Sequence, residues 1–288
     1  MKGIILAGGT GSRLFPLTKV TNKHLLPVGE EPMLLHPVRK LVEAGVRKIL
    51  IVTGTEHMGD VVGLLGSGRE YGCQFTFRVQ DEAGGIAQAL ALGENFAGDD
   101  KICVLLGDNI FADGLGDDVA AFEAQESGAR VFLKSVPDPG RYGVARVDGD
   151  RVTEIIEKPK DPPSDLAVTG IYFYDSDVFD IIRGLEPSAR GEYEITDVNN
   201  AYLESGDLHV ELMGRGIAWL DTGTYESLLQ AQNFVETLQE RQGLRIACIE
   251  EISYHNDWIT REELLALGRE MKNSSYGEYL RRLAGEGG

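Results

Sequence analysis

A glycine-rich turn near the N-terminus has the composition of a phosphate-binding loop. Gly8, Gly9 and Gly11 follow a short apolar run, and Arg13 comes two residues after the last glycine. Glycines let the backbone curl so that several N–H groups point at one anion, and the arginine adds a full positive charge. The turn lacks the third glycine of the dinucleotide fingerprint, because Leu14 stands there, and it lacks the Gly-Lys-Ser/Thr of a P-loop. We therefore expect a nucleotide site of another kind.

Two aspartates stand where apolar segments end. Asp108 follows Val-Leu-Leu-Gly, and Asp221 follows Ala-Trp-Leu. A carboxylate at the end of a buried strand needs a neighbouring cation, and two carboxylates with phosphate oxygens suit the octahedral oxygen shell of Mg²⁺. The hypothesis is a Mg²⁺ site; the alternative is that both aspartates cap helices or form turns.

The elements that must position these residues follow a βαβ rhythm in the first half of the chain. Apolar runs predict strands at 4–7, 49–53, 75–79 and 102–106, with helically spaced apolar residues between them. This alternation predicts an α/β fold with a doubly wound, mostly parallel central sheet. Sites in such sheets lie outside the carboxyl ends of the strands, where both the glycine turn and Asp108 fall.

After about residue 130 the sequence becomes rich in strands. Residues 141–147 and 151–156 flank a Val-Asp-Gly-Asp turn and predict a hairpin, which we expect to frame a second substrate. An apolar stripe predicts a helix over 224–241. Residues 244–288 are expected to form one short apolar strand and two small helices.

Composition and charge exclude several classes of partner. The chain has 288 residues with 28 Lys and Arg against 46 Asp and Glu, a formal net charge of −18. This field repels polyanions, so we expect neither nucleic acid nor an anionic membrane as partner. We find no apolar stretch of membrane-spanning length and no signal-peptide pattern. Cys73, Cys103 and Cys248 are widely spaced, which argues against disulfides or zinc and favours the cytoplasm.

Several motifs together resemble one enzyme family. Gly-Gly-Thr-Gly-Ser-Arg-Leu, with Lys23 and Pro27 downstream, is similar to the signature of the sugar-phosphate nucleotidyltransferases, and within them to the glucose-1-phosphate thymidylyltransferases. Further segments recur in family order over nearly the whole chain: Val-Gln-Asp, Leu-Gly-Asp-Asn-Ile-Phe, Arg-Tyr-Gly-Val, Glu-Lys-Pro, Val-Thr-Gly-Ile-Tyr and Trp-Leu-Asp-Thr-Gly-Thr. The family usually has Thr in place of Ser12 and often Gln or Pro in place of His24, and neither change affects the chemistry.

The resemblance implies a Rossmann-like nucleotidyltransferase fold and a division of the chain. Residues 1–243 would form the nucleotidyltransferase domain, in which 1–130 bind the nucleotide and 131–243 bind the sugar phosphate. Residues 244–288 would be a C-terminal extension that makes subunit contacts in a homotetramer. By resemblance, the extension would also form a second nucleotide site for feedback inhibition; the alternative is a packing tail without a regulatory role.

The implied reaction condenses dTTP with α-D-glucose 1-phosphate to dTDP-glucose and pyrophosphate, with Mg²⁺ as cofactor, as a first step toward deoxysugars such as rhamnose. A sugar 1-phosphate is already an anionic nucleophile, so a single in-line displacement needs alignment and charge neutralisation more than a general base. The five histidines show no metal-ligand spacing and no serine occupies a nucleophile elbow.

The family's functional positions carry over to matching residues of this chain. The implied catalytic residues are Arg13 and Lys23, and the implied metal ligands are Asp108 and Asp221. The implied nucleotide-binding positions are Leu6, Gly8, Gly9, Gly11, Gln80, Gly85 and Asp108. The implied sugar-phosphate-binding positions are Asn109, Tyr142, Gly143, Glu157, Lys158, Val168 and Thr169. Lys158 would hold the sugar phosphate, and we expect the following proline to keep Lys158 extended. Taken singly, most of these side chains fit ordinary surface or loop roles.

Three alternatives stay open at this point. Gln80 is followed by Asp-Glu-Ala-Gly-Gly, whereas several relatives have Pro-x-Pro-Asp-Gly, so an enzyme specific for UTP or for another sugar 1-phosphate remains the close alternative. A catalytically silent nucleotide-sugar-binding regulatory subunit is disfavoured because the implied charged residues are all present. A nicotinamide dehydrogenase is disfavoured by the missing third glycine.

Overall fold

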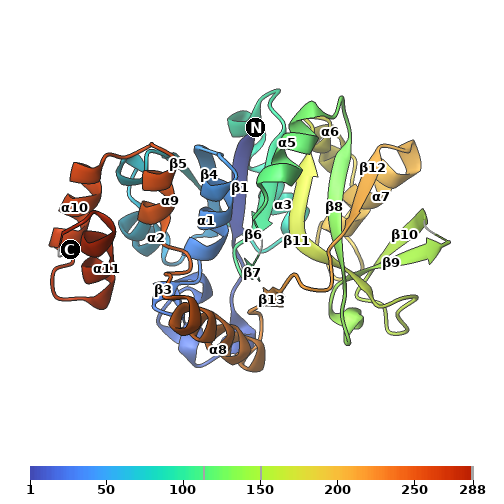
Figure 1. Ribbon diagram of the computed structural model, residues 1–288. Helices are drawn as coiled ribbons and strands as arrows, with labels where there is room; N and C mark the ends of the chain where they lie inside the picture. Colours follow the sequence, from blue (N-terminus) through green and yellow to red (C-terminus); the bar gives the residue numbers. More distant parts are fainter. Residues whose placement is uncertain (113, 150, 287–288) are drawn as a thin grey trace.

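The computed structural model describes residues 1–112, 114–149 and 151–286, and within them a nine-stranded sheet lies between two layers of helices (Figure 1). The first four strands of this sheet are parallel, in the order β6-β1-β4-β5. They are β1 (Lys2–Ala7), β4 (Lys48–Gly54), β5 (Gln74–Gln80) and β6 (Ile102–Leu106). These are the four strands that the apolar runs predict, so the doubly wound parallel half is confirmed.

The second half of the sheet joins the first through an antiparallel pair, β6 with β11. Its strands are β8 (Ala129–Ser135), β9 (Gly143–Asp148), β10 (Arg151–Glu157), β11 (Leu166–Tyr174) and β12 (Leu208–Leu212). Both β8 and β9 pair with β11, and the β9–β10 hairpin projects from the sheet on the right of Figure 1. The predicted hairpin is confirmed, although its first strand begins at Gly143 and its turn residue Asp150 lies outside the described residues.

The remaining strands form two small two-stranded sheets. They are β2 (Pro27–Val28) with β3 (Glu31–Pro32), and β7 (Asn109–Phe111) with β13 (Trp219–Asp221). The β7–β13 pair brings Asn109 opposite Asp221 although 112 positions of sequence separate them. This pair therefore carries both predicted metal ligands to one place.

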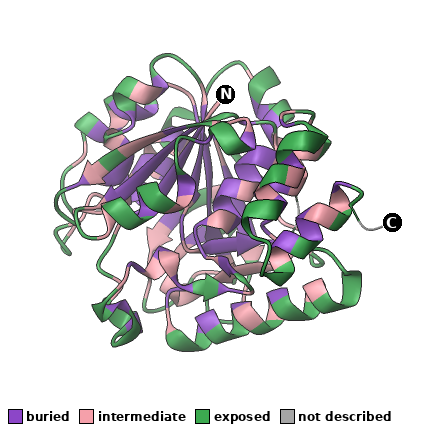
Figure 2. Cartoon of the chain, turned by 90° about the vertical axis from the view of Figure 1, so that its left-hand side faces the viewer, coloured by how far each residue is buried: buried purple, intermediate pink, exposed green. Residues whose placement is uncertain are grey.

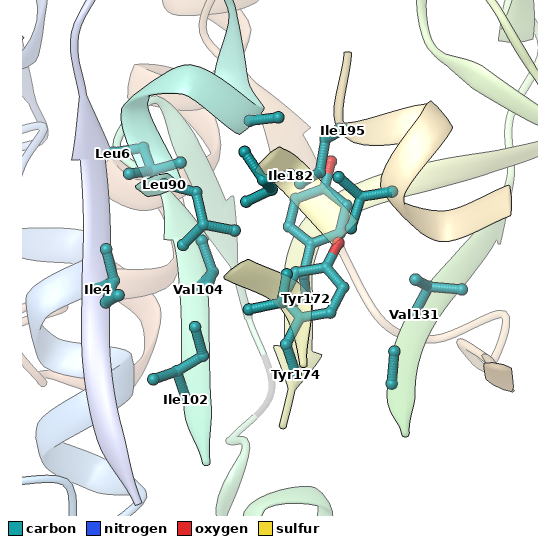
Figure 3. Packing of buried hydrophobic residues seen from close by; sticks show 14 of the residues in the cluster. Ile4, Leu6, Leu90, Ile102, Val104, Val131, Tyr172, Tyr174, Ile182 and Ile195 are labelled. Carbon is teal, nitrogen blue, oxygen red and sulfur yellow. The ribbon is translucent and has the colours of Figure 1, made fainter. Parts of the chain in front are cut away.

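Alternate side chains of the buried strands feed two separate cores. On one face Ile4 and Leu6 pack with Leu90, Tyr172 and Tyr174 (Figure 3). The helices over this face are α3 (Ile86–Ala91), α4 (Glu94–Ala97), α6 (Val178–Arg183) and α7 (Ile195–Ser205). The period of two along a strand sends its other residues to the opposite face.

On that opposite face Ile5 and Ala7 pack with residues of another helical layer. Its helices are α1 (Leu35–Glu43), α2 (Met58–Leu65), α5 (Gly116–Ala124) and α9 (Ile249–His255). Figure 2 shows buried strands at the centre and helices whose outward faces are exposed. Short 3₁₀ turns occupy several loops: η1 (Ser12–Leu14), η2 (Leu17–Lys19), η3 (Lys23–Leu25), η4 (Arg69–Tyr71) and η5 (Pro139–Arg141).

The C-terminal part contains helices only, within the described residues. The predicted long helix is confirmed as α8 (Tyr225–Gln242), which Thr224 caps with a reciprocal Thr224–Ser227 capping box. Then come α9, α10 (Arg261–Glu270) and α11 (Ser275–Leu283). The expectation of one strand and two helices over 244–288 is therefore wrong. Cys248 packs into the core of the extension and Ile249 into the core beneath α1, so the apolar segment turns between two clusters instead of extending along one sheet edge.

Among the described residues, no helix is both long enough and apolar enough to cross a membrane.

Candidate active site

The glycine turn, the end of β5 and the end of β6 surround one cavity of about 220 Å³. Six of the seven predicted nucleotide-binding residues line it: Leu6, Gly8, Gly9, Gln80, Gly85 and Asp108. Lys23 and His24 complete the wall beside Asp108. Gly11 lies just outside, where its carbonyl accepts a hydrogen bond from the Thr18 hydroxyl at 2.8 Å. The cavity lies at the carboxyl ends of parallel strands, where ligands bind in doubly wound sheets.

Two glycines of this cavity are required by close contacts. A Cβ at Gly8 would lie 2.4 Å from Gln80 Oε1, and a Cβ at Gly85 would lie 2.5 Å from the Tyr193 carbonyl oxygen. Gly85 also has φ of 103°, which side-chain-bearing residues rarely adopt. Any larger residue at either position would therefore shift the walls of the cavity.

Lys23 and Asp108 form a short ion pair at the base of the cavity. Lys23 Nζ lies 2.6 Å from Asp108 Oδ2, and both side chains are less than one-fifth exposed. Burial alone would raise the pKa of Asp108, but the Lys23 ammonium group holds this pKa well below its usual range. Asp108 is therefore ionised at neutral pH, as a metal ligand must be.

His24 lies beside this pair as a neutral side chain. Burial, with a further contribution from Lys23, lowers the pKa of His24 to about 3. Asn22 Oδ1 accepts a hydrogen bond from the His24 backbone N–H at 2.9 Å and lies 2.8 Å from His24 Nδ1. Since that oxygen can only accept, Nδ1 carries the proton.

A chain of hydrogen bonds extends from Asp108 to β13. Asn109 Nδ2 donates to Asp108 Oδ1 at 2.8 Å, and Trp219 Nε1 donates to Asn109 Oδ1 at 2.6 Å. Thr222 donates from both its backbone N–H and its hydroxyl to the Asp108 carbonyl oxygen, at 3.0 and 2.8 Å. The segments around the two predicted metal ligands are thus held together by side chains as well as by the β7–β13 ladder.

Asp221 has an arginine as its partner. Arg141 Nη2 lies 2.9 and 3.1 Å from the two carboxylate oxygens of Asp221. Tyr142 packs on Trp219 with ring centroids 4.8 Å apart, and burial together with Asp221 raises the pKa of Tyr142. Arg13 also approaches: a Cβ at Gly223 would lie 3.0 Å from Arg13 Nη2 and 3.3 Å from Asp221 Oδ2. The Arg13 guanidinium group and the Asp221 carboxylate therefore both lie beside Gly223.

Asp108 and Asp221 have the chemistry of Mg²⁺ ligands. Asp108 directly precedes β7 and Asp221 ends the paired strand β13, and each carboxylate is balanced in this structure by a protein cation. No group of three or more His, Cys, Asp and Glu side chains within 1–112, 114–149 and 151–286 is arranged to hold a metal. The two aspartates fit a site in which substrate phosphates supply further oxygens.

A second cluster forms where the β9–β10 ladder ends. Glu157 Oε2 accepts a hydrogen bond from the Thr196 hydroxyl at 2.6 Å, and Glu157 Oε1 lies 3.2 Å from Lys158 Nζ and 3.3 Å from Arg190 Nη2. A Cβ at Gly143 would lie 3.1 Å from Thr196 Oγ1. Four predicted sugar-phosphate residues, Tyr142, Gly143, Glu157 and Lys158, are therefore neighbours. Together with Arg190, they offer one carboxylate and two cations to a phosphorylated, hydroxyl-rich molecule.

The predicted conformation of Lys158 is wrong. Its φ is 42°, in the left-handed region and not extended. The Lys158 N–H still donates to the Tyr142 carbonyl at 2.9 Å, so the chain turns at the last rung of the ladder before Pro159. A non-glycine residue in this region costs on the order of 1 kcal/mol and marks a position that surrounding contacts determine.

The remaining predicted sugar-site residues lie on β11 and at its edge. The β11–β8 pairing is irregular between Val168 and Tyr172. Thr169 is fully buried, and its hydroxyl has no hydrogen-bond partner among the described residues. A Cβ at Gly170 would lie 2.6 Å from Asn109 Oδ1. Asn109 therefore lies against β11 at Gly170, the residue that follows Val168 and Thr169 in the sequence.

Arg141, Arg190 and Gln88 are among the side chains of this site that were not predicted from the sequence. Arg141 adjoins the predicted Tyr142, so its place in the Arg-Tyr-Gly-Val motif was an available signal. Arg190 contacts Glu157 across 33 positions, and Gln88 lies 2.9 Å from Gln80. Neither of these partners is indicated by a local pattern.

Known proteins resemble this chain over nearly its whole length. The model of the nucleotidyl transferase family matches residues 2–238. A glucose-1-phosphate thymidylyltransferase of Neisseria meningitidis serogroup A is 48% identical over 285 residues, covering 98% of this chain and 99% of the relative. One from Mycobacterium tuberculosis is 45% identical, covering 98% of this chain and 99% of the relative. These matches include most of the C-terminal extension.

Solved structures share the fold. A Bacillus anthracis chain, named as a glucose-1-phosphate thymidylyltransferase and solved with sucrose, is 58% identical with a TM-score of 0.79, covering 82% of this chain and 95% of that one. A UDP-glucose pyrophosphorylase bound to UDP-glucose is 25% identical with a TM-score of 0.71, covering 82% of this chain and 98% of that one. The chain is thus similar over its length to enzymes that join a nucleotide to a sugar phosphate.

Proposed function

The chain belongs to the nucleotidyl transferase family, and we propose that it condenses dTTP with α-D-glucose 1-phosphate to dTDP-glucose and pyrophosphate. The observation that carries the proposal is the cavity in which the glycine turn, Gln80 and the Lys23–Asp108 pair meet. Relatives that match nearly the full length and bear that enzyme name support the choice of substrates. The product would supply the synthesis of deoxysugars such as rhamnose.

The proposed reaction is one in-line displacement. A phosphate oxygen of glucose 1-phosphate attacks the α-phosphorus of dTTP, the bond from that phosphorus to the α–β bridging oxygen breaks, and pyrophosphate leaves with the electron pair. The nucleophile is already an anion, so no protein base has to remove a proton. The work of the protein is to align two anions and to balance their charge.

The two clusters divide this work. Gly8, Gln80 and Gly85 would hold the base, while Arg13 and Lys23 would bind the triphosphate. Glu157 would accept hydrogen bonds from the sugar hydroxyls, and Lys158 with Arg190 would hold the sugar phosphate in line. This division is supported by Tyr142 of the second cluster, which packs on Trp219 of β13, the strand that pairs with β7 next to Asp108.

Asp108 and Asp221 are the residues that would hold Mg²⁺. When bound there, the ion would neutralise charge on the phosphate oxygens. The Lys23 and Arg141 side chains occupy the same carboxylates in this structure, so each has to share or release its aspartate when the metal and the triphosphate enter.

Three further proposals concern the setting of the enzyme. We infer a cytoplasmic location, which three free cysteines, Cys73, Cys103 and Cys248, support. A homotetramer follows from the resemblance alone, and sedimentation of the purified chain would test it. Subunit contacts and feedback control by residues 244–288 likewise remain a prediction, to be tested by comparing the full and truncated chains in the presence of dTDP-rhamnose.

The proposed reaction is tested by pyrophosphate release with Mg²⁺. The grid combines dTTP, UTP, CTP, ATP and GTP with the 1-phosphates of glucose, galactose, mannose and N-acetylglucosamine. The dTTP and glucose 1-phosphate pair is expected to dominate. Dominant activity with another pair of nucleotide and sugar 1-phosphate would support the same mechanism with different substrates. An empty grid with retained triphosphate binding would indicate a silent binding subunit instead.

A preference for UTP is the second candidate. It is supported by the likeness to UDP-glucose pyrophosphorylase, although that identity is far lower than the identity to the thymidylyltransferases. The dTTP and UTP rows of the grid, compared at equal concentration, distinguish the two.

A further inference from the structure

Gln80 presents its amide to the nucleotide cavity in one defined orientation. The side chain is 8% exposed and ends β5 at the cavity wall. Gln80 Nε2 lies 2.9 Å from Gln88 Oε1 and 3.4 Å from the Gly85 carbonyl oxygen. Gln80 Oε1 points the other way, toward Gly8, where an added Cβ would lie 2.4 Å from it.

Gln88, on α3, determines this orientation. Its Oε1 accepts a hydrogen bond from the Gly84 backbone N–H at 2.9 Å. A backbone N–H can only donate, so the Gln88 atom that faces Gly84 must be the oxygen. The Gln80 atom that faces the same oxygen must then be nitrogen, as the Gly85 carbonyl also requires.

Gly84 makes this approach possible. A Cβ at Gly84 would lie 2.4 to 2.6 Å from the Gln88 amide atoms, which leaves no room for a side chain. The Gly84 N–H therefore donates to the Gln88 oxygen, and the Gln80 nitrogen donates to the same oxygen. The Gln80 oxygen is left for the ligand.

An oxygen at this position selects a class of base. Thymine and uracil carry N3–H and guanine carries N1–H, and these donors can meet an acceptor. Cytosine N3 and adenine N1 carry a lone pair, so they would place acceptor against acceptor in a site sheltered from water. An unpaired polar contact of this kind strongly disfavours the wrong ligand.

We propose that Gln88 is a positioning residue for base selection, which locks the Gln80 oxygen toward the base and so rejects cytosine nucleotides. This inference rests on the proposed nucleotide site and extends it to a residue outside the direct contacts. Among the pyrimidines, the selected class is the one with a protonated N3.

The test measures discrimination between dTTP and dCTP in a set of variants of the full chain. Gln88→Leu removes the acceptor that fixes Gln80, so the ratio of kcat/KM for dTTP over dCTP should fall by about tenfold or more. Gln88→Glu keeps an oxygen that accepts from both Gly84 and Gln80, and should retain most of the ratio. Gln74→Leu, an exposed glutamine on the same strand, is the matched control and should leave it unchanged.

A double-mutant cycle separates positioning from general damage. If Gln88 acts through Gln80, then Gln88→Leu should not change the ratio further in a Gln80→Ala background. A merely structural role would lower both kcat/KM values together and keep their ratio. An unchanged ratio in a folded Gln88→Leu variant would overturn the proposal.

Binding constants keep this test separate from the proposed reaction. The dissociation constants of dTTP and dCTP are measured by calorimetry for the same variants. If the preference for binding dTTP over dCTP falls in Gln88→Leu, the role of Gln88 is supported even when no sugar phosphate is turned over. An absence of turnover would contradict the proposed reaction and not the role of Gln88. Equal binding of dTTP and dCTP by the unaltered chain would overturn the role of Gln88.

Discussion

At the scale of single residues, the site depends on cations that each form an ion pair with a largely buried carboxylate. Lys23 lies 2.6 Å from Asp108, and its charge holds the pKa of Asp108 well below the usual range although burial acts in the opposite direction. The same ammonium group lines the nucleotide cavity. Lys23 is therefore placed both to keep Asp108 ionised and to contact a phosphate.

Lys23→Ala should lower kcat by about 10²- to 10³-fold, because it removes positive charge where negative charge accumulates in the transition state. The fold should survive, since Lys23 Nζ contributes to the site and to neither core. Steady-state pyrophosphate release and circular dichroism are the two measurements. Lys19→Ala, an exposed lysine in the same loop, is the control and should remain near normal. Near-normal turnover of Lys23→Ala would remove Lys23 from the catalytic residues.

At the scale of elements, the site exists because β7, β13 and the turn η5 meet. The β7–β13 pair aligns Asn109 with Asp221, and η5 ends at Arg141, which binds both oxygens of Asp221. The ion pair of Arg141 with Asp221 thus lies directly on one of the predicted metal ligands. A metal that binds Asp221 has to compete with this guanidinium group.

Arg141→Gln should therefore tighten Mn²⁺ binding by several-fold in the absence of nucleotide, because it removes a competing cation from Asp221. Free Mn²⁺ is measured by electron paramagnetic resonance during titration of the protein. Asp221→Asn should weaken binding, and Arg146→Gln, which removes an exposed arginine of β9 paired with Glu154, should leave it unchanged. Equal affinities of Arg141→Gln and the unaltered chain would show that Arg141 does not compete.

Elements with strong local signals could be predicted from the sequence. The four parallel strands follow from apolar runs of strand length, and α8 follows from the Thr224 cap and from Gly243, which has φ of 67°. The apolar segment before α9 was misread as a strand because its side chains enter two different cores, a fact of tertiary packing. The left-handed Lys158 likewise depends on a contact with Tyr142 and not on the proline beside it.

Prediction of the site from the sequence was likewise limited to residues with a local signal. The glycine turn and Asp108 stand at strand ends, so their convergence could be expected from the βαβ rhythm. The ion pairs of Arg141 with Asp221 and of Arg190 with Glu157 join positions 80 and 33 residues apart. Gln88 acts through an amide orientation that only the Gly84 N–H determines. Such partners depend on the folded chain, and no local spacing encodes them.

At the scale of the whole molecule, the main domain and the C-terminal helices each bury an acidic side chain, Glu31 and Glu250. Glu31 of β3 is 2% exposed, and neither of its carboxylate oxygens has a hydrogen-bond partner among the described residues. Glu250 of α9 is 5% exposed and accepts a hydrogen bond from the Tyr276 hydroxyl at 2.7 Å. Burial first, and then the charge of Glu250, raises the pKa of Glu31 to about 8, while Arg39 opposes the shift.

This shift makes stability depend on pH in a stated direction. In the unfolded chain Glu31 loses its proton near its ordinary pKa of 4.5, whereas the folded protein keeps it until about pH 8. The contribution of the protonated group is therefore complete below about pH 4.5 and is lost as pH rises to about 8. Glu31→Gln cannot ionise, so its free energy of unfolding should match the unaltered chain near pH 5 and exceed it increasingly up to pH 8. Urea unfolding at each pH measures this difference, and the exposed Glu204→Gln should show none. A difference that stays constant from pH 5 to pH 9 would mean that Glu31 does not titrate in this range.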